Sequence, residues 1–462
     1  MNTWNGDSNI EWVIDVNKVI HLAERAELSL SYTESCQSED FRKRSGAFYT
    51  PADVAEHFWN IFFARRKIKT CNSTKYFLKR SCFIEPSAGG GALFFSLIKA
   101  LLTKGLTPEV ISTINLDLVD INIRALQFIS EQINHIEKLW GIRFTNVRLI
   151  EKNFLLYNLP DTEKTPVFFG NPPFVQNNRN ESAWKNLYAD FVETSLKLTE
   201  NPIHMSYILP LSISFSRDYK RLRLLLSSSQ SEISIANYDN IPDTLFKTGK
   251  PKNRNTNKAN SQRCSIVNLV PTGQNRVYST RLHRWNKSAR REFLNTVPTF
   301  YDVSNFPIRD QIPRPKNKKM AIFLQADFAM KELVELTGKT PNHQLIIASV
   351  ARNYIGFRDK NSTTCHTLNF ENEKNFLTAL GILSSQLFFE YWLSIGDGFH
   401  VTKKDVLFFP ISKEIEQKTI KLHPQIKSFW EKRNKFAKLK INRGIVTKSF
   451  DFSNVAPKLI NK

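Results

Sequence analysis

The residues best suited to chemistry are four consecutive ones, Asn171, Pro172, Pro173 and Phe174, directly after the apolar residues 168–170. The two prolines stiffen the backbone and remove two N–H donors, while the carbonyl oxygens of the loop can still accept hydrogen bonds. The Asn171 amide adds an acceptor, and the Phe174 ring offers a flat surface for stacking. Such a loop suits a substrate with an amino group on an aromatic ring, as in adenine. An ordinary turn also uses Asn-Pro, so other parts of the chain must support this interpretation.

A run of small residues between a predicted strand and a predicted helix is the second candidate site. Residues 81–84 have the composition of a short buried strand, and the apolar residues 93–102 that of a helix. Small side chains between them let a ligand approach the backbone, and a helix start presents free N–H groups. Glu85, at the end of the strand, would repel a phosphate but attract an amino or sulfonium cation. The candidate residues of this turn are Glu85, Pro86, Ser87, Ala88, Gly89 and Gly91.

Further predicted strands place polar residues at their carboxyl ends, where a doubly wound α/β sheet binds ligands. Residues 115–122 alternate like a strand and carry an acid suited to ribose hydroxyls. Residues 147–150 predict the next strand, which leads to one amide and one aromatic side chain that could hold an adenine ring. These candidates are Asp120, Asn153 and Phe154.

The composition narrows the class of protein without naming it. The chain has 462 residues, with 65 Lys and Arg against 43 Asp and Glu, and a formal net charge of +22. This excess favours a polyanionic partner, although a basic ribosomal or membrane-surface protein shares it. The cysteines are few, odd in number and without metal-ligand spacing, so we expect a reducing cytoplasm and no metal. We find no signal-peptide core and no apolar run long enough to span a bilayer.

Taken in order, these motifs resemble those of amino-methylating DNA methyltransferases, specifically the N6-adenine class of restriction–modification systems. Residues 46–51 resemble the N-terminal cofactor motif, and residues 85–94 the Asp/Glu-Pro-x-x-Gly-x-Gly loop. Residues 153–154 resemble the Asp-Phe pair at the cofactor adenine, and residues 171–174 the catalytic Asn-Pro-Pro-Tyr/Phe. The order fits the gamma arrangement, and the resemblance covers roughly residues 46–270.

The resemblance implies a doubly wound, seven-stranded Rossmann-like α/β sheet followed by a C-terminal α+β target-recognition domain. It implies S-adenosylmethionine as methyl donor, double-stranded DNA as substrate and no membrane partner, and it allows a separately encoded restriction endonuclease. The target adenine would be flipped out and stack on Phe174 and on Tyr219, with Phe215 as the alternative to Tyr219. The implied cofactor contacts are Tyr49, Thr50, Glu85, Pro86, Ser87, Ala88, Gly89, Gly91, Asp120, Ile121, Asn153, Phe154 and Asn171.

Three departures from the family pattern keep alternatives open. Small residues (Ser87, Ala88 and Gly90) replace the commoner Ala, Cys and Ser, and Asn153 stands where Asp is usual. Asn-Pro-Pro-Phe also occurs in ribosomal-RNA guanine methyltransferases, so Phe174 bears on the substrate. N4-cytosine in DNA, an RNA amino group and a catalytically silent DNA-binding subunit remain alternatives. Protein-glutamine methyltransferases use a similar loop, but the basic C-terminal region argues against a peptide substrate.

The rest of the chain offers candidate DNA contacts. A basic, Asn-rich loop at residues 247–258 separates two predicted strands, 232–238 and 264–270, which we expect to form the antiparallel hairpin that closes the sheet. Residues 352–358 interleave cations and aromatic side chains, a mix that suits base and phosphate contacts. The candidate DNA contacts are Lys250, Lys252, Arg254, Arg352 and Arg358.

The predicted organisation has four parts, and no carboxylate cluster typical of a nuclease is found in the sequence. These parts are a helical arm (1–45), a methyltransferase catalytic domain (46–275), a target-recognition domain (276–415), and a basic C-terminal helix and tail (416–462).

Overall fold

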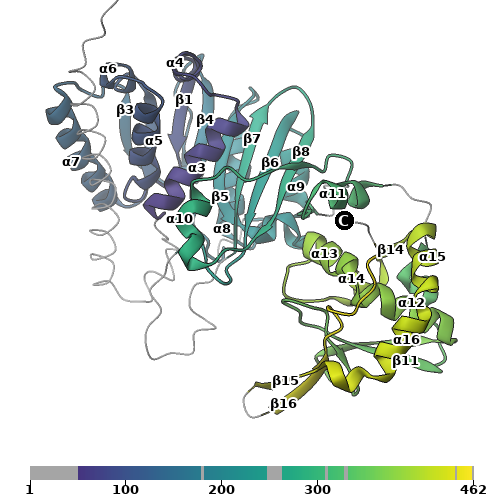
Figure 1. Cartoon of the computed structure of the whole chain (residues 1–462). Coiled ribbons are helices and arrows are strands. Elements are labelled where there is room, and N and C mark those ends of the chain that lie inside the picture. The colour runs from purple at the N-terminus through teal and green to yellow at the C-terminus, as the bar shows by residue number, and fades with distance from the viewer. Residues whose placement is uncertain are drawn as a thin grey trace, which may run out of the picture. The chain divides into compact units, whose positions relative to one another are not determined.

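The computed structural model describes residues 50–177, 182–246, 263–306, 311–326, 331–442 and 445–459. Residues 440–442 and 445 are described by their backbone alone. The predicted N-terminal arm, Tyr49 and the basic loop with Lys250, Lys252 and Arg254 lie outside the described residues. The chain divides into two compact units between Gln311 and Ile312, and each is described by itself (Figure 1).

The first unit is built on a nine-stranded sheet of order β3-β2-β1-β4-β5-β7-β6-β8-β9. Strands β1 to β5 are parallel neighbours, and β7 runs antiparallel to both β5 and β6. The strands from β3 to β6 in this order form the predicted Rossmann-like methyltransferase sheet, including its antiparallel closing hairpin. The strands are β1 (Ser81–Glu85), β2 (Asn115–Asp120), β3 (Val147–Glu151), β4 (Thr165–Gly170), β5 (His204–Pro210), β6 (Ser231–Tyr238), β7 (Cys264–Pro271), β8 (Arg276–His283) and β9 (Tyr301–Asp302).

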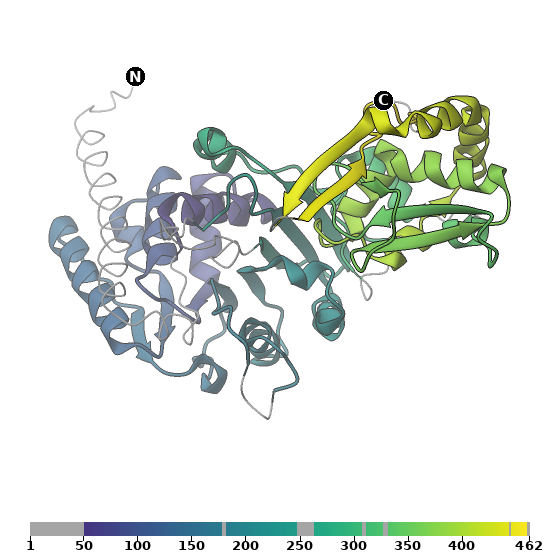
Figure 2. The same cartoon turned by 90° about the horizontal axis from the view of Figure 1, so that it is seen from below.

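Helices cover both faces of this sheet, which explains why its central strands are apolar on both sides. Helices α3 and α5 lie on one face and α8 and α9 on the other (Figures 1 and 2). Aromatic side chains of α3 fill the first interface: Trp59 is fully buried, with its ring centroid 5.0 Å from that of Phe169 on β4. The helices are α3 (Ala52–Arg65), α4 (Cys71–Arg80), α5 (Ala92–Thr103), α6 (Pro108–Ile111), α7 (Ile123–Trp140), α8 (Leu187–Lys197), α9 (Lys220–Ser227) and α10 (Arg290–Leu294).

The predicted domain boundary at residues 275/276 is wrong, because the sheet continues past it. Strand β8 pairs with β6 in parallel, from Glu232↔Arg276 to Tyr238↔His283, and β9 pairs with β8. The sheet therefore has nine strands rather than seven. Arg290 also ties this region to the first unit, since its guanidinium binds Asp53 at the start of α3 at 2.6 Å and Asp243 at 3.3 Å.

The second unit combines helices with a five-stranded sheet of order β13-β11-β12-β16-β15. Helices α15 and α16 pack on α12, where Gly381 is required because a Cβ there would lie 2.5 Å from the Ile426 side chain. The helices are α11 (Lys318–Gln325), α12 (Glu373–Ser384), α13 (Gln386–Ile395), α14 (Lys403–Leu407), α15 (Lys413–Lys421) and α16 (His423–Glu431). The strands are β10 (Lys331–Glu332), β11 (His343–Ala348), β12 (Phe357–Arg358), β13 (Cys365–Phe370), β14 (Pro410–Ile411), β15 (Ala437–Asn442) and β16 (Ile445–Phe450).

The prediction of a separate helical tail at 416–462 is also wrong. This segment holds two helices that pack on α12 and a β-hairpin that joins the sheet of the second unit through β12. The missed signal is the alternation of Lys438 and Lys440 with Leu439 and Ile441, a period of two that indicates a strand rather than a helix.

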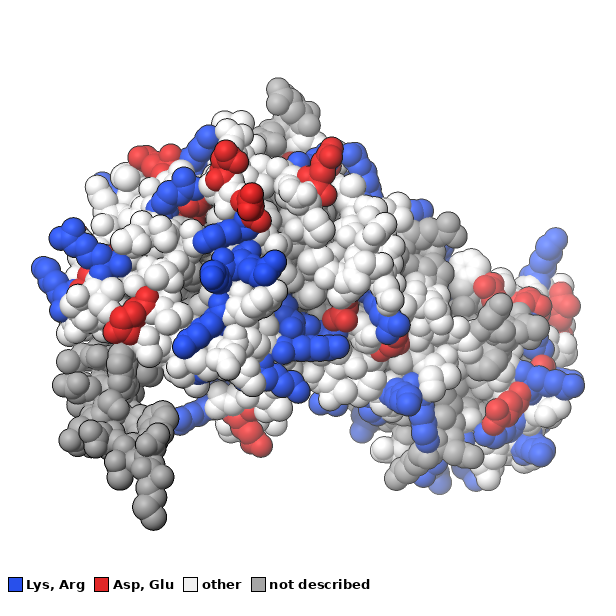
Figure 3. All heavy atoms as spheres, turned by 90° about the horizontal axis from the view of Figure 1, so that it is seen from above, with Lys and Arg blue, Asp and Glu red and all other residues white. Residues whose placement is uncertain are grey.

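Basic side chains of the first unit also lie away from the predicted catalytic edge. Lys and Arg gather on the side viewed from above in Figure 3, the side on which α4 lies in Figure 1. Helix α4 ends where β1 begins, so this is the edge opposite to the carboxyl ends of the parallel strands. Net charge therefore does not by itself locate a binding surface.

The described residues include neither a clear membrane-spanning helix nor a cluster of metal-ligand side chains. No single helix in these ranges is long and apolar enough to cross a membrane. Helices α12 and α13 together have the length and composition of a membrane span, but they are bent by 63° at their junction. Within the same ranges, no group of three or more His, Cys, Asp or Glu side chains is placed to hold a metal ion.

Candidate cofactor and catalytic site

The sequence motifs converge at one edge of the first sheet. Glu85 ends β1, Asp120 ends β2 and Gly170 ends β4. Since β1 lies between β2 and β4 and all three are parallel, their carboxyl ends meet at the same edge. The turn after β1 and the Asn-Pro-Pro-Phe loop after β4 are therefore neighbours, although 84 residues separate Ser87 from Asn171.

Two hydrogen bonds join the Asn-Pro-Pro-Phe loop to the expected cofactor motifs. The Ser87 hydroxyl donates to the Asn171 backbone carbonyl at 3.2 Å. The Asn171 side-chain nitrogen donates to the Thr50 hydroxyl at 3.3 Å, and Thr50 is buried directly before Pro51 at the start of α3. The second bond orients the Asn171 amide. Three motifs that are far apart in the sequence are thus connected through one asparagine.

The glycine-rich turn needs its glycines. Gly91 has φ +77°, and a Cβ there would lie 2.9 Å from Phe95 and 3.1 Å from Ile129. Gly89, at φ +51°, donates its N–H to the Asp120 carboxylate at 2.8 Å, and the second Asp120 oxygen accepts from the Asn122 N–H at 2.8 Å. Asp120 thus holds the turn in place at the end of β2, the position expected of a ribose-binding acid.

Two carboxyl groups lie in a desolvated environment at this edge. Glu85 is 2% exposed, and its Oε2 atom accepts no hydrogen bond from the described residues. Burial, followed by the charge of Asp120, raises the pKa of Glu85 well above its usual range. Burial also raises the pKa of Asp120, against the opposing effect of its backbone hydrogen bonds. A cation bound here would compensate both groups.

The Asn153–Phe154 pair differs from expectation. Asn153 is exposed and accepts a hydrogen bond from the Leu155 N–H at 3.1 Å, which caps the short 3-10 helix η1 (Phe154–Leu156). Phe154 is only 1% exposed, with its ring centroid 5.3 Å from that of Phe191. The expectation that its ring is available to an adenine is therefore corrected, because the ring is part of the core between the sheet and α8.

Two exposed aliphatic side chains lie at the same edge. Ile121, which follows β2, is 72% exposed, and Leu156, at the end of η1, is 67% exposed. Strands β2 and β3 pair as far as Asp120↔Glu151, so both side chains follow adjacent strand ends. The sequence prediction included Ile121 but missed Leu156. Leu156 could have been found from its position in the short segment that follows Asn153.

Aromatic side chains surround the Asn-Pro-Pro-Phe loop. Tyr188 lies between Phe174 and Tyr219, with ring centroids 6.3 and 5.1 Å away respectively. Tyr219 is 7% exposed and also stacks on Trp184, with centroids 6.5 Å apart. The structure thus places Tyr219 inside an aromatic cluster rather than open to a ligand. Phe174 is only partly buried. The sequence prediction missed Trp184 and Tyr188, whose signal is their i, i+4 spacing just after the loop.

The described DNA-contact candidates belong to the second unit. Arg352 is exposed, with its guanidinium carbon 5.2 Å from the centroid of the Phe399 ring. Arg358, in β12, donates to the Thr364 hydroxyl at 3.5 Å. The two arginines therefore lie in a different unit from the Asn-Pro-Pro-Phe loop.

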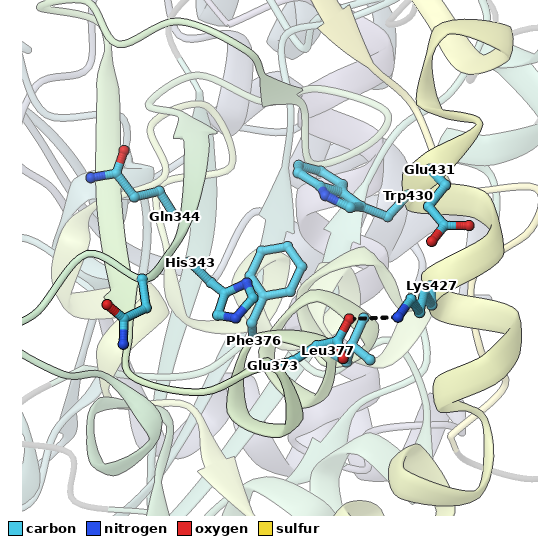
Figure 4. Close-up of a pocket in the computed structure, with 9 residues that line it drawn as sticks. His343, Gln344, Glu373, Phe376, Leu377, Lys427, Trp430 and Glu431 are labelled. Atoms are coloured by element: carbon cyan, nitrogen blue, oxygen red, sulfur yellow. Dashed lines mark ion pairs between the residues drawn. The ribbon is translucent and has the colours of Figure 1, made fainter.

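The second unit also has a surface pocket of about 350 Å³ (Figure 4). The His343 ring stacks on Phe376, and Trp430 lies edge-on to Phe376 at 5.4 Å. A salt bridge of 2.9 Å joins Glu373 and Lys427 at the rim. None of the residues that line this pocket is a predicted catalytic or cofactor residue.

Comparisons with known proteins gave structural similarities only; no protein-family model and no curated protein matches the chain. The chain is similar to a DrdV–DNA complex (15% identity, TM-score 0.47), over 72% of this chain and 38% of that one. It is similar to the type IIG restriction endonuclease BpuSI (13% identity, TM-score 0.43), over 87% of this chain and 63% of that one. It is also similar to a type I restriction–modification methyltransferase subunit from Streptococcus thermophilus (16% identity, TM-score 0.36), over 54% of each chain. This chain thus spans less than two thirds of each of them. Since every TM-score is below 0.5, the fold assignment rests on the strand order of the sheet itself.

Proposed function

We propose that this chain is an S-adenosylmethionine-dependent DNA methyltransferase of the restriction–modification type, acting in the cytoplasm on the N6 amino group of adenine. The observation that supports this most is that Asn171 bonds to both Ser87 and Thr50, so the predicted catalytic loop contacts two of the predicted cofactor motifs. The net charge of +22 suits a DNA substrate. A separately encoded endonuclease for the same DNA site is part of the proposal.

The residues at the sheet edge fit the cofactor. S-adenosylmethionine supplies an electrophilic methyl group on a positively charged sulfur, and it also carries an ammonium group. Glu85 is a buried carboxyl with an oxygen that accepts no hydrogen bond from the described residues, which suits a cation. The left-handed Gly91 and the small residues before it keep side chains out of the space next to the turn.

In this proposal, Asn171 and Pro172 activate the target nitrogen. The lone pair of an adenine amino group is delocalised into the ring, which makes the nitrogen a poor nucleophile. The Asn171 side-chain oxygen and the Pro172 carbonyl accept its two N–H hydrogens, which favours a pyramidal nitrogen with an available lone pair. Two consecutive prolines hold these acceptors in a fixed geometry, so the rate gain comes mainly from positioning and electrostatics.

The target base must leave the duplex to reach this loop, because its amino group is inaccessible within the stack. Phe174 stacks on the flipped base in this proposal. Since Tyr219 lies in the aromatic cluster, its part is to support Phe174 through Tyr188 rather than to cover the base directly.

The test is transfer of a labelled methyl group to mixed double-stranded DNA, followed by nucleoside analysis. We expect N6-methyladenine from the wild type and a rate roughly 100- to 1000-fold lower from Asn171→Ala, as for loss of one preorganised polar group in an active site. The variant should still bind S-adenosylmethionine. Asn201→Ala, which makes the same change at an exposed residue after α8, is the control and should leave the rate unchanged.

Each other outcome removes a defined part of the proposal. Near-wild-type transfer by Asn171→Ala would exclude the assigned role of this residue. N4-methylcytosine would keep the mechanism and change the base. Label found in ribosomal RNA but not in DNA would overturn the DNA substrate, and a chain that binds no S-adenosylmethionine would be a silent DNA-binding subunit.

A further inference from the structure

Strands β15 and β16 form a two-stranded ribbon that projects from the second unit (Figure 1). The two strands pair with each other from Ala437↔Phe450 to Asn442↔Ile445. Contact with the rest of the sheet is limited to the base, where Phe450 pairs with Phe357 of β12. Six residues of β-strand extend about 20 Å. Among the described residues, most of this length therefore pairs only within the ribbon.

The base of the ribbon is held firmly although its length projects. Phe452, directly after β16, is 1% exposed and lies among aromatic rings from α16, β12 and the ribbon itself. Its ring centroid is 4.7 Å from that of Phe429 and 5.5 Å from that of Phe357. An isolated hairpin is only marginally stable in water, so this aromatic base is what keeps the ribbon formed.

The two faces of the ribbon differ in chemistry. Directly paired residues point to the same face, so Lys438 lies on the face of its partner Ser449, together with Thr447 two residues before. The opposite face carries Leu439 and Val446, which are 70% and 61% exposed, together with Lys448, the partner of Leu439. Hydroxyl groups and Lys438 thus lie on one face, whereas the exposed aliphatic side chains lie on the other.

The hydroxyl-bearing face continues into a segment that the sequence had already marked for DNA contact. The Ser449 hydroxyl lies 3.2 Å from the Tyr354 hydroxyl, in the stretch of interleaved cations and aromatics at 352–358. Arg352 and Asn353, just before Tyr354, are exposed. Two segments almost a hundred residues apart therefore form one polar surface.

Charge favours a polyanion as the partner of this surface. Every charged residue from 432 to 450 is basic. Some of these cations are already compensated, since Asp359 binds Arg433 at 2.9 Å and lies 3.8 Å from Lys448. Lys438, by contrast, is exposed on the hydroxyl-bearing face.

We propose that the β15–β16 ribbon binds double-stranded DNA with its Lys438–Thr447–Ser449 face. The major groove admits a two-stranded ribbon, lysines at its sides can reach phosphates, and Ser and Thr hydroxyls can bond to base edges. This inference rests on the proposed function, since it takes DNA as the substrate. It gives the C-terminal segment a direct part in DNA binding.

The experiment measures binding of the full chain to mixed-sequence duplex DNA by fluorescence anisotropy, at several salt concentrations. For Lys438→Ala we expect binding roughly tenfold weaker near 0.1 M salt and a slope of log K against log salt reduced by about 1, equally for all sequences. Leu439→Ser, on the opposite face, and Lys413→Ala, which removes the same charge from α15, are the controls and should change neither quantity. Unchanged thermal midpoints establish that all three variants are folded.

The inference is overturned if Lys438→Ala keeps the wild-type slope, or if Lys413→Ala lowers it as much. It is also overturned if only Leu439→Ser has an effect, whether on DNA binding, on binding to anionic lipid vesicles or on the oligomeric state. Because the readout is binding, its failure is separable from that of the proposed function. Methyl transfer to DNA with an unchanged slope contradicts the ribbon alone, whereas a reduced slope without methyl transfer contradicts the methyltransferase alone.

Discussion

Replacement of Glu85 by glutamine preserves the size of the side chain and removes its charge. Glu85 is 2% exposed, its Oε2 accepts no hydrogen bond from the described residues, and burial with the neighbouring Asp120 raises its pKa well above the usual range. Both effects disfavour the charged carboxylate in the protein without ligand. A cation that enters the site favours the carboxylate and releases the proton, so ligand binding and the titration of Glu85 are linked.

The glutamine variant should lose affinity without losing stability. Truncation of one partner of a buried charge pair costs about 2–5 kcal/mol, so we expect S-adenosylmethionine to bind roughly 30- to 5000-fold more weakly to Glu85→Gln. A carboxyl whose pKa is raised by folding stabilises the fold at low pH, and that contribution is lost as the pH rises through the folded-state pKa. At neutral pH the variant should therefore be at least as stable as the wild type.

Titration calorimetry with S-adenosylmethionine over a range of pH provides the test. Wild-type affinity should fall as the pH is lowered, because a bound cation favours the carboxylate form of Glu85, whereas the affinity of Glu85→Gln should depend much less on pH. Glu151→Gln makes the same change at an exposed residue at the end of β3 and should behave as wild type. A Glu85→Gln protein with wild-type affinity and wild-type pH dependence would refute the assignment of a bound cation to this carboxyl.

Two further predictions concern stability. Burial lowers the pKa of His57 to about 4, so as the pH falls the unfolded chain takes up this proton before the folded protein does. The free energy of unfolding should therefore drop by about 2 kcal/mol between pH 7 and pH 5. Urea titrations should find a smaller drop in His57→Gln. Gly91→Ala should destabilise the fold by roughly 2–4 kcal/mol through left-handed strain and contact with Phe95. Gly105→Ala, at φ +79° with no atom within 4 Å of a Cβ, isolates the strain and should cost only about 1 kcal/mol.

Features that depend on a few consecutive residues could be read from the sequence. Apolar runs and periodicities predicted β1, β2, β3, β6, β7 and the helix α5, which follows β1. The order of these elements predicted that Glu85, Asp120 and Asn171 would lie near one sheet edge, because parallel strands all end on the same side. The small residues before α5 marked a turn that the structure forms with two glycines at positive φ.

Features that depend on distant partners could not be read in this way. Phe154 and Tyr219 are aromatic residues in the right places, yet the side chains of α8 and its flanking loop enclose both. The first unit extends to Gln311 rather than to residue 275 because β8 pairs with the edge of β6. That edge exists only in the assembled sheet.

The chain by itself thus determined the local geometry of the turn after β1 and the Asn-Pro-Pro-Phe loop, since covalent constraints such as the fixed φ of proline and the freedom of glycine act within a residue or two. Tertiary structure decided that Asn171 bonds to both Ser87 and Thr50, and that the C-terminal segment forms a ribbon beside Tyr354. Burial and hydrogen bonding depend on which segments pack together, and that is a property of the whole fold.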